Sequence, residues 1–100
     1  MLSKPPPSGG WIGVRLFRSK EGPGAKIGLV FSGSPAEKAG ICPGDIVTHW
    51  GPQAVDSPSS LSDLVRRTRV DETVRVTLLR AENASREGVD VTITPKPLQF

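Results

Sequence analysis

Cysteine is nearly absent from this sequence, since Cys42 is the only one in 100 residues. A single thiol excludes an intrachain disulfide and any metal site built from several cysteines. No apolar run approaches the ~18 residues that a membrane-spanning helix requires. The first seven residues, from Met1 to Pro7, lack the apolar core of a signal peptide. We therefore expect no disulfide framework, no membrane segment in this chain, no metal site and no cofactor.

Histidine is equally scarce, since His49 is the only one, and the sequence indicates no catalytic partner for it. The sequence contains neither a Gly-x-Ser-x-Gly nor a His-Glu-x-x-His motif, so neither a nucleophile nor a zinc-binding helix is indicated. We interpret His49 as a strand residue at the surface and expect no enzymatic activity from this chain.

An excess of charge is also lacking, because the net charge is only +3. The densest basic group is Arg66, Arg67 and Arg69, which we interpret as the solvated face of a helix. A nucleic-acid-binding small barrel therefore remains only a remote alternative, which steeply salt-dependent binding to DNA or RNA would support.

Glycine and proline, by contrast, are frequent, with 11 and 10 residues, and they separate short apolar runs. Residues 1–10 are rich in proline and glycine and are predicted to be a linker. The apolar content of 36% is enough for one modest core. We therefore expect a single domain over residues 11–94, followed by a tail over residues 95–100.

Alternation of apolar and polar residues predicts five principal strands. The predicted strands cover residues 11–19, 26–32, 45–50, 73–80 and 89–94. In the second strand, the period of two places Ile27, Leu29 and Phe31 on one face. Residues 51–53 are predicted to form a turn and residues 81–88 a polar loop.

Two helices are indicated by their capping residues. Ser34, Pro35 and Glu37 form a helix start, and Gly40 suits the left-handed residue that ends a helix. Ser57 begins a second, amphipathic helix over residues 58–69. The predicted fold class is therefore α+β: mainly β, with five to six strands in a partly open antiparallel barrel or sandwich, capped by one short and one longer helix.

The stretch from Gly10 to Val14 is the most informative for function. An apolar loop turns at Gly13 and continues into a strand. Successive backbone N–H groups in such a loop form a concavity suited to an anion, and an open strand edge beside it can accept an added strand. These features indicate a site for the carboxyl end of a peptide. An ordinary buried strand start remains the alternative.

Three motifs resemble those of PDZ domains, of the permuted bacterial type in HtrA/Deg serine proteases, tail-specific proteases and site-two proteases. The Trp-Ile-Gly-Val sequence at 11–14 resembles the carboxylate-binding loop. Residues 33–47 resemble the family's Gly-Ser-Pro-Ala-x-x-Ala-Gly-Leu-x-x-Gly-Asp-x-Ile sequence, and residues 61–80 resemble its second helix and the strand that follows.

The resemblance implies a groove in which backbone N–H groups of the loop bind a peptide's terminal carboxylate. The first strand would pair with the peptide, and the second helix would complete the pocket for its last side chain. The implied peptide-binding residues are Trp11, Ile12, Gly13, Val14, Arg15, Leu16, Phe17, Ser62 and Val65. Because Gly13 would approach the ligand, we expect Gly13→Val to abolish binding and leave the fold largely intact.

The implied function is recognition of protein C-termini or extended segments by strand addition. The resemblance implies a substrate-binding or regulatory domain of a cell-envelope protease, with a periplasmic or envelope location and an upstream protease domain as partner. A PDZ module of a non-protease scaffold or of a secretion complex is the alternative.

The chain's own tail, Leu98-Gln99-Phe100, ends in a hydrophobic residue and is the kind of ligand that such a groove should accept. The hypothesis is weak head-to-tail self-association at high concentration, and a frayed tail is the alternative. Self-association predicts that resonances of residues 12–14 shift with concentration in the full chain but not in a chain truncated after Pro95. The same concentration dependence in both chains, or none in either, would contradict it.

Overall fold

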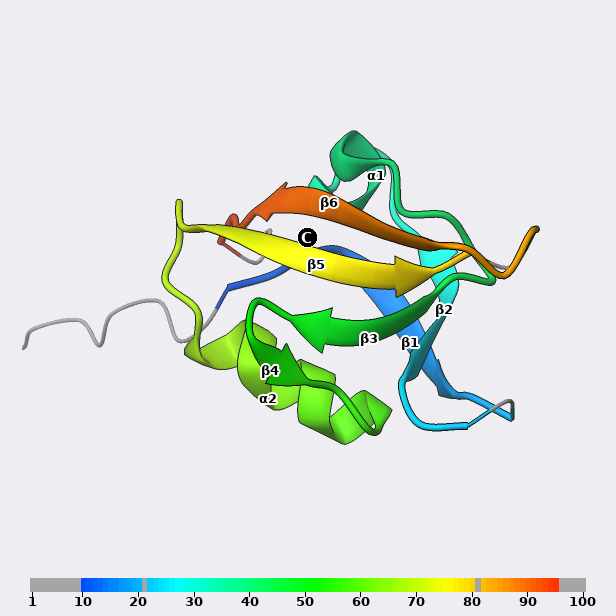
Figure 1. Ribbon diagram of the computed structural model, residues 1–100. Helices are drawn as coiled ribbons and strands as arrows, with labels where there is room; N and C mark the ends of the chain where they lie inside the picture. The colour runs from blue at the N-terminus through cyan, green and yellow to red at the C-terminus, as the bar shows by residue number, and fades with distance from the viewer. Residues whose placement is uncertain (1–9, 21, 81, 96–100) are drawn as a thin grey trace, which may run out of the picture.

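In the part of the chain that the structure describes, six strands form one curved antiparallel sheet (Figure 1). The structure is a computed structural model and describes residues 10–20, 22–80 and 82–95. The strands are β1 (Val14–Arg18), β2 (Ala25–Val30), β3 (Ile46–Trp50), β4 (Gln53–Ala54), β5 (Thr73–Leu79) and β6 (Arg86–Thr92). The helices are α1 (Pro35–Ala39) and α2 (Pro58–Arg67). The main strand order is β1-β2-β3-β5-β6, and β4 pairs with β3.

The two ends of the sheet approach one another through a single bridge. The Trp11 N–H donates to the Thr94 carbonyl at 2.9 Å, which joins the residues before β1 to the residues after β6. Beyond this bridge, β1 pairs with β2 alone among the described residues, which leave its other edge open. The predicted α+β fold, a partly open antiparallel barrel with one short and one longer helix, is thereby confirmed.

Several predicted boundaries were wrong. β1 begins at Val14 rather than at residue 11, and β4 includes Gln53, which was assigned to a turn. β6 begins at Arg86, within the predicted polar loop, because Arg86 pairs with Leu79 and extends the ladder of β5. The first three residues of β6 are exposed, so they carry no apolar alternation that marks a strand.

The predicted apolar face of β2 is interrupted by a β-bulge. Arg15 faces Leu29, but the next residue of β1, Leu16, faces Ile27. Gly28 is therefore an extra residue, and the inward and outward faces exchange beyond it. Ile27 is fully buried, whereas Leu29 and Phe31 are exposed, so the prediction of one shared face was wrong.

The capping residues of α1 act as the sequence predicted, with one change. Ser34 Oγ accepts a hydrogen bond from the Glu37 N–H at 3.2 Å, and Gly40 ends the helix at φ +86°. The Glu37 carboxylate accepts from the N–H of Gly33, one residue before the cap. Two backbone donors at the start of α1 are thus satisfied, which stabilises a helix of only five residues.

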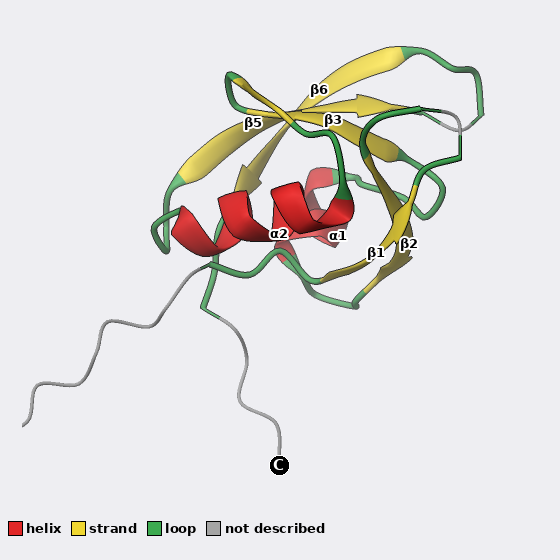
Figure 2. Cartoon of the chain, turned by 90° about the horizontal axis from the view of Figure 1, so that it is seen from below, coloured by secondary structure: helices red, strands yellow, loops and turns green. Residues whose placement is uncertain are grey.

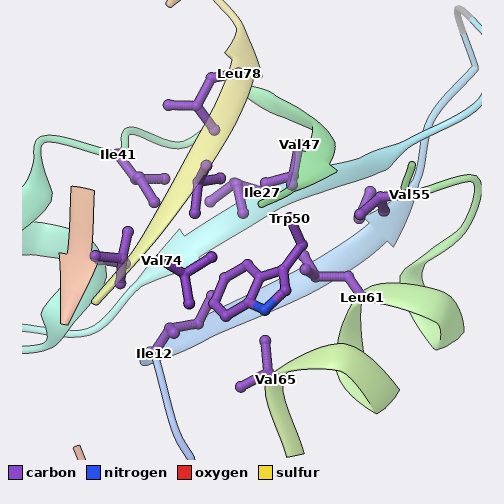
Figure 3. Close-up of a cluster of buried hydrophobic side chains, with 14 of the residues drawn as sticks. Ile12, Ile27, Ile41, Val47, Trp50, Val55, Leu61, Val65, Val74 and Leu78 are labelled. Atoms are coloured by element: carbon purple, nitrogen blue, oxygen red, sulfur yellow. The ribbon is translucent and has the colours of Figure 1, made fainter. Parts of the chain in front are cut away.

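The longer helix, α2, covers the core through Leu61 and Val65 (Figure 3). Trp50 extends from β3 towards Val65 and is only 5% exposed. Its indole N–H donates to Thr68 Oγ1 at 3.0 Å, and the Thr68 hydroxyl donates to the Leu64 carbonyl at 2.7 Å. Thr68 therefore caps α2 and fixes it to the sheet, and the helix ends at Arg67, two residues before the predicted end.

A buried ion pair joins α1, the following turn and the last two strands. Asp45 is buried and pairs with Arg80, whose guanidinium also donates to the Gly40 carbonyl at 2.9 Å and to Glu87. Asp45 also accepts from the Cys42 N–H at 2.9 Å, within the turn that follows α1. The hydrogen bond to Glu87 and the charge of Asp45 outweigh burial and raise the pKa of Arg80, so its guanidinium stays charged.

We expect Arg80→Met to destabilise the fold by about 3 kcal/mol, because it leaves the Asp45 carboxylate buried without its partner. The matched control is Arg75→Met, which breaks the exposed pair of Arg75 with Asp90. Exposed pairs contribute about 0–1 kcal/mol, so this control should unfold close to the parent chain. Chemical denaturation measures both changes, and equal losses would contradict a special role for the buried pair.

Candidate functional site

A groove of about 810 Å³ lies between β1 and α2, at the open edge of the sheet. Figure 2 shows the backbone of these two elements. One wall is the loop before β1 together with the first residues of that strand, and the other wall is one side of α2. The lining residues are Gly10, Trp11, Ile12, Gly13, Val14, Arg15, Leu16, Pro58, Ser59, Ser62, Asp63, Val65 and Arg66.

The loop at the end of the groove is oriented by its carbonyl groups. The Ile12 carbonyl accepts from the Ala36 N–H of α1 at 2.9 Å, and the Gly13 carbonyl accepts from the Phe31 N–H at 2.9 Å. The N–H groups of Ile12 and Gly13 donate to no partner among the residues that the structure describes. Successive free N–H groups of this kind form a concavity that binds anions.

The hydrogen-bonding register of β1 directs further polar groups to the open edge. Because Phe31 donates to Gly13, Val14 and Val30 form a non-hydrogen-bonded pair in the antiparallel ladder. The N–H and C=O groups of Val14 therefore point away from β2, towards the groove. An added strand would find hydrogen-bonding partners on this edge.

The groove combines an apolar floor with charges on its rim. Val14 and Leu16 are half-buried against the core, and Val65 of α2 is only 8% exposed. On the rim, Asp63 and Arg66 form an exposed ion pair one turn apart on α2. The floor suits an aliphatic side chain, while the rim stays hydrated.

Most of the predicted site residues come together in this groove. Its lining includes Trp11, Ile12, Gly13, Val14, Arg15, Leu16, Ser62 and Val65. The exception is Phe17, which is 54% exposed and does not line the groove. Trp11 stacks on Phe31 with ring centroids 6.2 Å apart and so packs beside the loop.

Sequence reasoning missed three polar residues of α2, Ser59, Asp63 and Arg66. They lie at intervals of three to four residues, so the helical spacing was the available signal. The predicted helix ran through all three, but the sequence did not show which stripe would face β1.

Among residues 10–20, 22–80 and 82–95 there is no cluster of residues suited to hold a metal ion. The same ranges contain no helix that is both long and apolar enough to cross a membrane.

A family model described as PDZ domain matches residues 10–93, most of the chain. The chain belongs to the PDZ-domain family. The resemblance noted in the sequence is thereby confirmed. PDZ domains are binding modules, in agreement with the expectation that this domain is not an enzyme.

Curated relatives of this PDZ domain are proteases of the HtrA type. A probable periplasmic serine endoprotease DegP-like of Rhizobium meliloti is 32% identical over 98 residues, which is 88% of this chain and 19% of the relative. Serine protease HTRA1 of Xenopus tropicalis is 34% identical over 77 residues, which is 77% of this chain and 15% of the relative. The chain therefore spans less than a fifth of the length of these two relatives.

Solved structures show the same fold. The serine endoprotease from Yersinia pestis aligns with a TM-score of 0.75 and 32% identity, over 89% of this chain and 30% of that one. An HtrA-type protease AlgW with decapeptide aligns at 0.83 and 22% identity, over 91% of this chain and 30% of that one. The HtrA3 PDZ domain bound to a phage-derived ligand aligns at 0.72 and 17% identity, over 84% of each chain.

The structure contradicts the expectation that Gly13→Val would leave the fold intact. Gly13 has φ +81°, and a Cβ added there would lie 2.2 Å from the Cβ of Ser34, the buried cap of α1. The close approach at Gly13 is therefore to the protein's own short helix.

We expect Gly13→Ala to destabilise the fold by about 2–4 kcal/mol, through backbone strain and the clash with Ser34. Gly33→Ala is the matched control, because Gly33 has a similar φ of +73° but open space around its Cβ position. The control should cost only about 1–2 kcal/mol. Thermal or chemical unfolding measures both, and equal losses would show that the contact with Ser34 is unimportant.

Proposed function

We propose that this PDZ domain binds the carboxyl ends of proteins, or extended segments, by β-strand addition to β1. The proposal rests on the N–H groups of Ile12 and Gly13, which donate no hydrogen bond to the described residues and lie at the end of an open strand edge. The N–H of Val14 points the same way. Together they offer a carboxylate several donors at one end of the groove.

The energetics of these contacts favour a terminal carboxylate over a neutral group. A hydrogen bond to a charged group contributes about 1.5–3 kcal/mol. Behind the carboxylate, the last side chain of the ligand would lie on the apolar floor formed by Val14, Leu16 and Val65. The ligand would then run antiparallel to β1 and exchange backbone hydrogen bonds with it.

The similar structures support this mode of binding. One is described as an HtrA-type protease AlgW with decapeptide, and another as the HtrA3 PDZ domain bound to the phage-derived ligand FGRWV. These descriptions concern those proteins, and we extend peptide binding to this chain on the strength of the shared fold and the groove.

The proposed context is a cell-envelope protease in which this domain captures substrate or regulates the protease domain. The support is that the curated relatives are serine proteases and that several are named periplasmic. In this proposal the domain covers residues 11–94, with a linker over 1–10 and a tail over 95–100. Apart from Gly10 and Pro95, that linker and that tail lie outside the described residues, as does the tail's proposed self-association.

A short peptide with a hydrophobic C-terminal residue should bind with micromolar affinity, as expected for a small, open groove. Amidation of its C-terminus should weaken binding at least tenfold, because the carboxylate's charge-assisted hydrogen bonds are lost. Titration calorimetry or fluorescence anisotropy measures the difference. Equal affinities for the acid and the amide would contradict carboxylate recognition.

A matched pair of variants locates the binding in the groove. Ser62→Trp places a large side chain in the groove from an exposed position on α2, and it should reduce affinity at least tenfold. Arg67→Trp places the same side chain on an exposed position of α2 outside the groove lining, and it should leave affinity unchanged. Equal effects of the two substitutions would place binding elsewhere.

A further inference from the structure

The outer face of the β1–β2 hairpin carries two exposed apolar side chains that do not line the groove. Phe17 is 54% exposed and Leu29 is 44% exposed. The ring of Phe17 occupies the space above Gly28, where an added Cβ would lie 1.8 Å from a ring carbon. Arg15 faces Leu29 across the two strands. The β-bulge at Gly28 is what turns Leu29 outward and completes this surface.

A strand added to β1 would place some of its own side chains beside this surface. With the terminal carboxylate at the loop N–H groups, the last ligand residue, position 0, lies beside Val14. Counting backwards along an antiparallel ligand, position −1 lies opposite Arg15 and position −3 opposite Phe17. Directly opposed residues of an antiparallel pair share one face of the sheet. Positions −1 and −3 therefore lie on the outer face.

The two residues of β1 that face positions −1 and −3 differ in chemistry. Arg15 has no ion pair among the described residues, and Asp63, the acidic residue that lines the groove, is paired with Arg66. A ligand carboxylate opposite Arg15 would supply the missing partner. Opposite Phe17, an aromatic side chain would cover apolar surface that is otherwise in water.

We propose that the outer face of β1 selects ligands with an acidic residue at position −1 and an aromatic residue at position −3. This selection rests on the proposed strand addition and extends it from the terminal residue to the residues before it. Phe17 lies outside the groove, and in this proposal it contributes to specificity by contacting the ligand on the outer face of β1.

The test compares peptides based on Ala-Ala-Phe-Ala-Glu-Val, each as the free acid, against the full 100-residue chain. Replacing Glu by Gln at −1 should weaken binding about threefold, and replacing Phe by Ala at −3 should do the same, as for other cross-strand pairs. Moving Glu from −1 to −5 should lose the preference. If Glu instead acted by general electrostatic attraction to a basic surface, the preference for Glu over Gln would be the same at −5 as at −1.

Variants assign each preference to its residue in double-mutant cycles. Arg15→Gln should abolish the preference for Glu over Gln at −1, whereas Arg67→Gln, outside the groove lining, should retain it. Phe17→Ala should abolish the preference for Phe at −3 and leave the preference at −1. If Phe17→Ala fails to fold, the two peptides that differ at −3 still decide the question on the parent chain.

The outcomes separate this inference from the proposed function. If the free acid binds better than the amide but substitutions at −1 and −3 change nothing, carboxylate recognition stands and the selection by the outer face is overturned. Selection by Arg15 is likewise overturned if Arg15→Gln weakens binding of the Glu and Gln peptides equally. If acid and amide bind equally well, the proposed function fails and the inference fails with it.

Discussion

Two hydrogen bonds orient the loop before β1, and the proposed carboxylate recognition depends on them. The carbonyls of Ile12 and Gly13 accept from Ala36 of α1 and from Phe31 beyond β2. Because the C=O of one residue and the N–H of the next point in opposite directions across a trans peptide, the inward carbonyls of Ile12 and Gly13 direct the N–H groups of Gly13 and Val14 towards the groove. Gly13 permits this arrangement because its positive φ and its close approach to Ser34 leave no space for a side chain. The proposed carboxylate site therefore consists of backbone groups whose orientation is set by contacts with the core.

The elements around that loop are anchored independently on both sides of the groove. On one side, the cap of α1 and the ion pair of Asp45 with Arg80 fix the short helix against β5 and β6. On the other side, the hydrogen bond from Trp50 to Thr68 fixes the end of α2 to β3. A preformed groove of this kind lowers the entropy lost on binding, which suits a module that holds short segments.

The accuracy of the sequence-based predictions followed the strength of the local signals. Capping residues were predicted correctly because their chemistry acts within a few residues. The apolar face of β2 was predicted wrongly, because the bulge at Gly28 depends on how β1 pairs with it. The start of β6 was missed because Arg86 is placed by its partner strand rather than by its own apolar pattern.

The sequence by itself determined the fold class, both helix starts and most residues that line the groove, because each was encoded in a motif or a period. Only the tertiary structure decided which side chains of these elements face the groove. Helical spacing did not show that Ser59, Asp63 and Arg66 would face β1, since that depends on how α2 packs over Trp50. Alternation with Val14 and Leu16 already places Phe17 on the opposite face of β1. Only the pairing with β2 shows that a bulge turns Leu29 onto that same face.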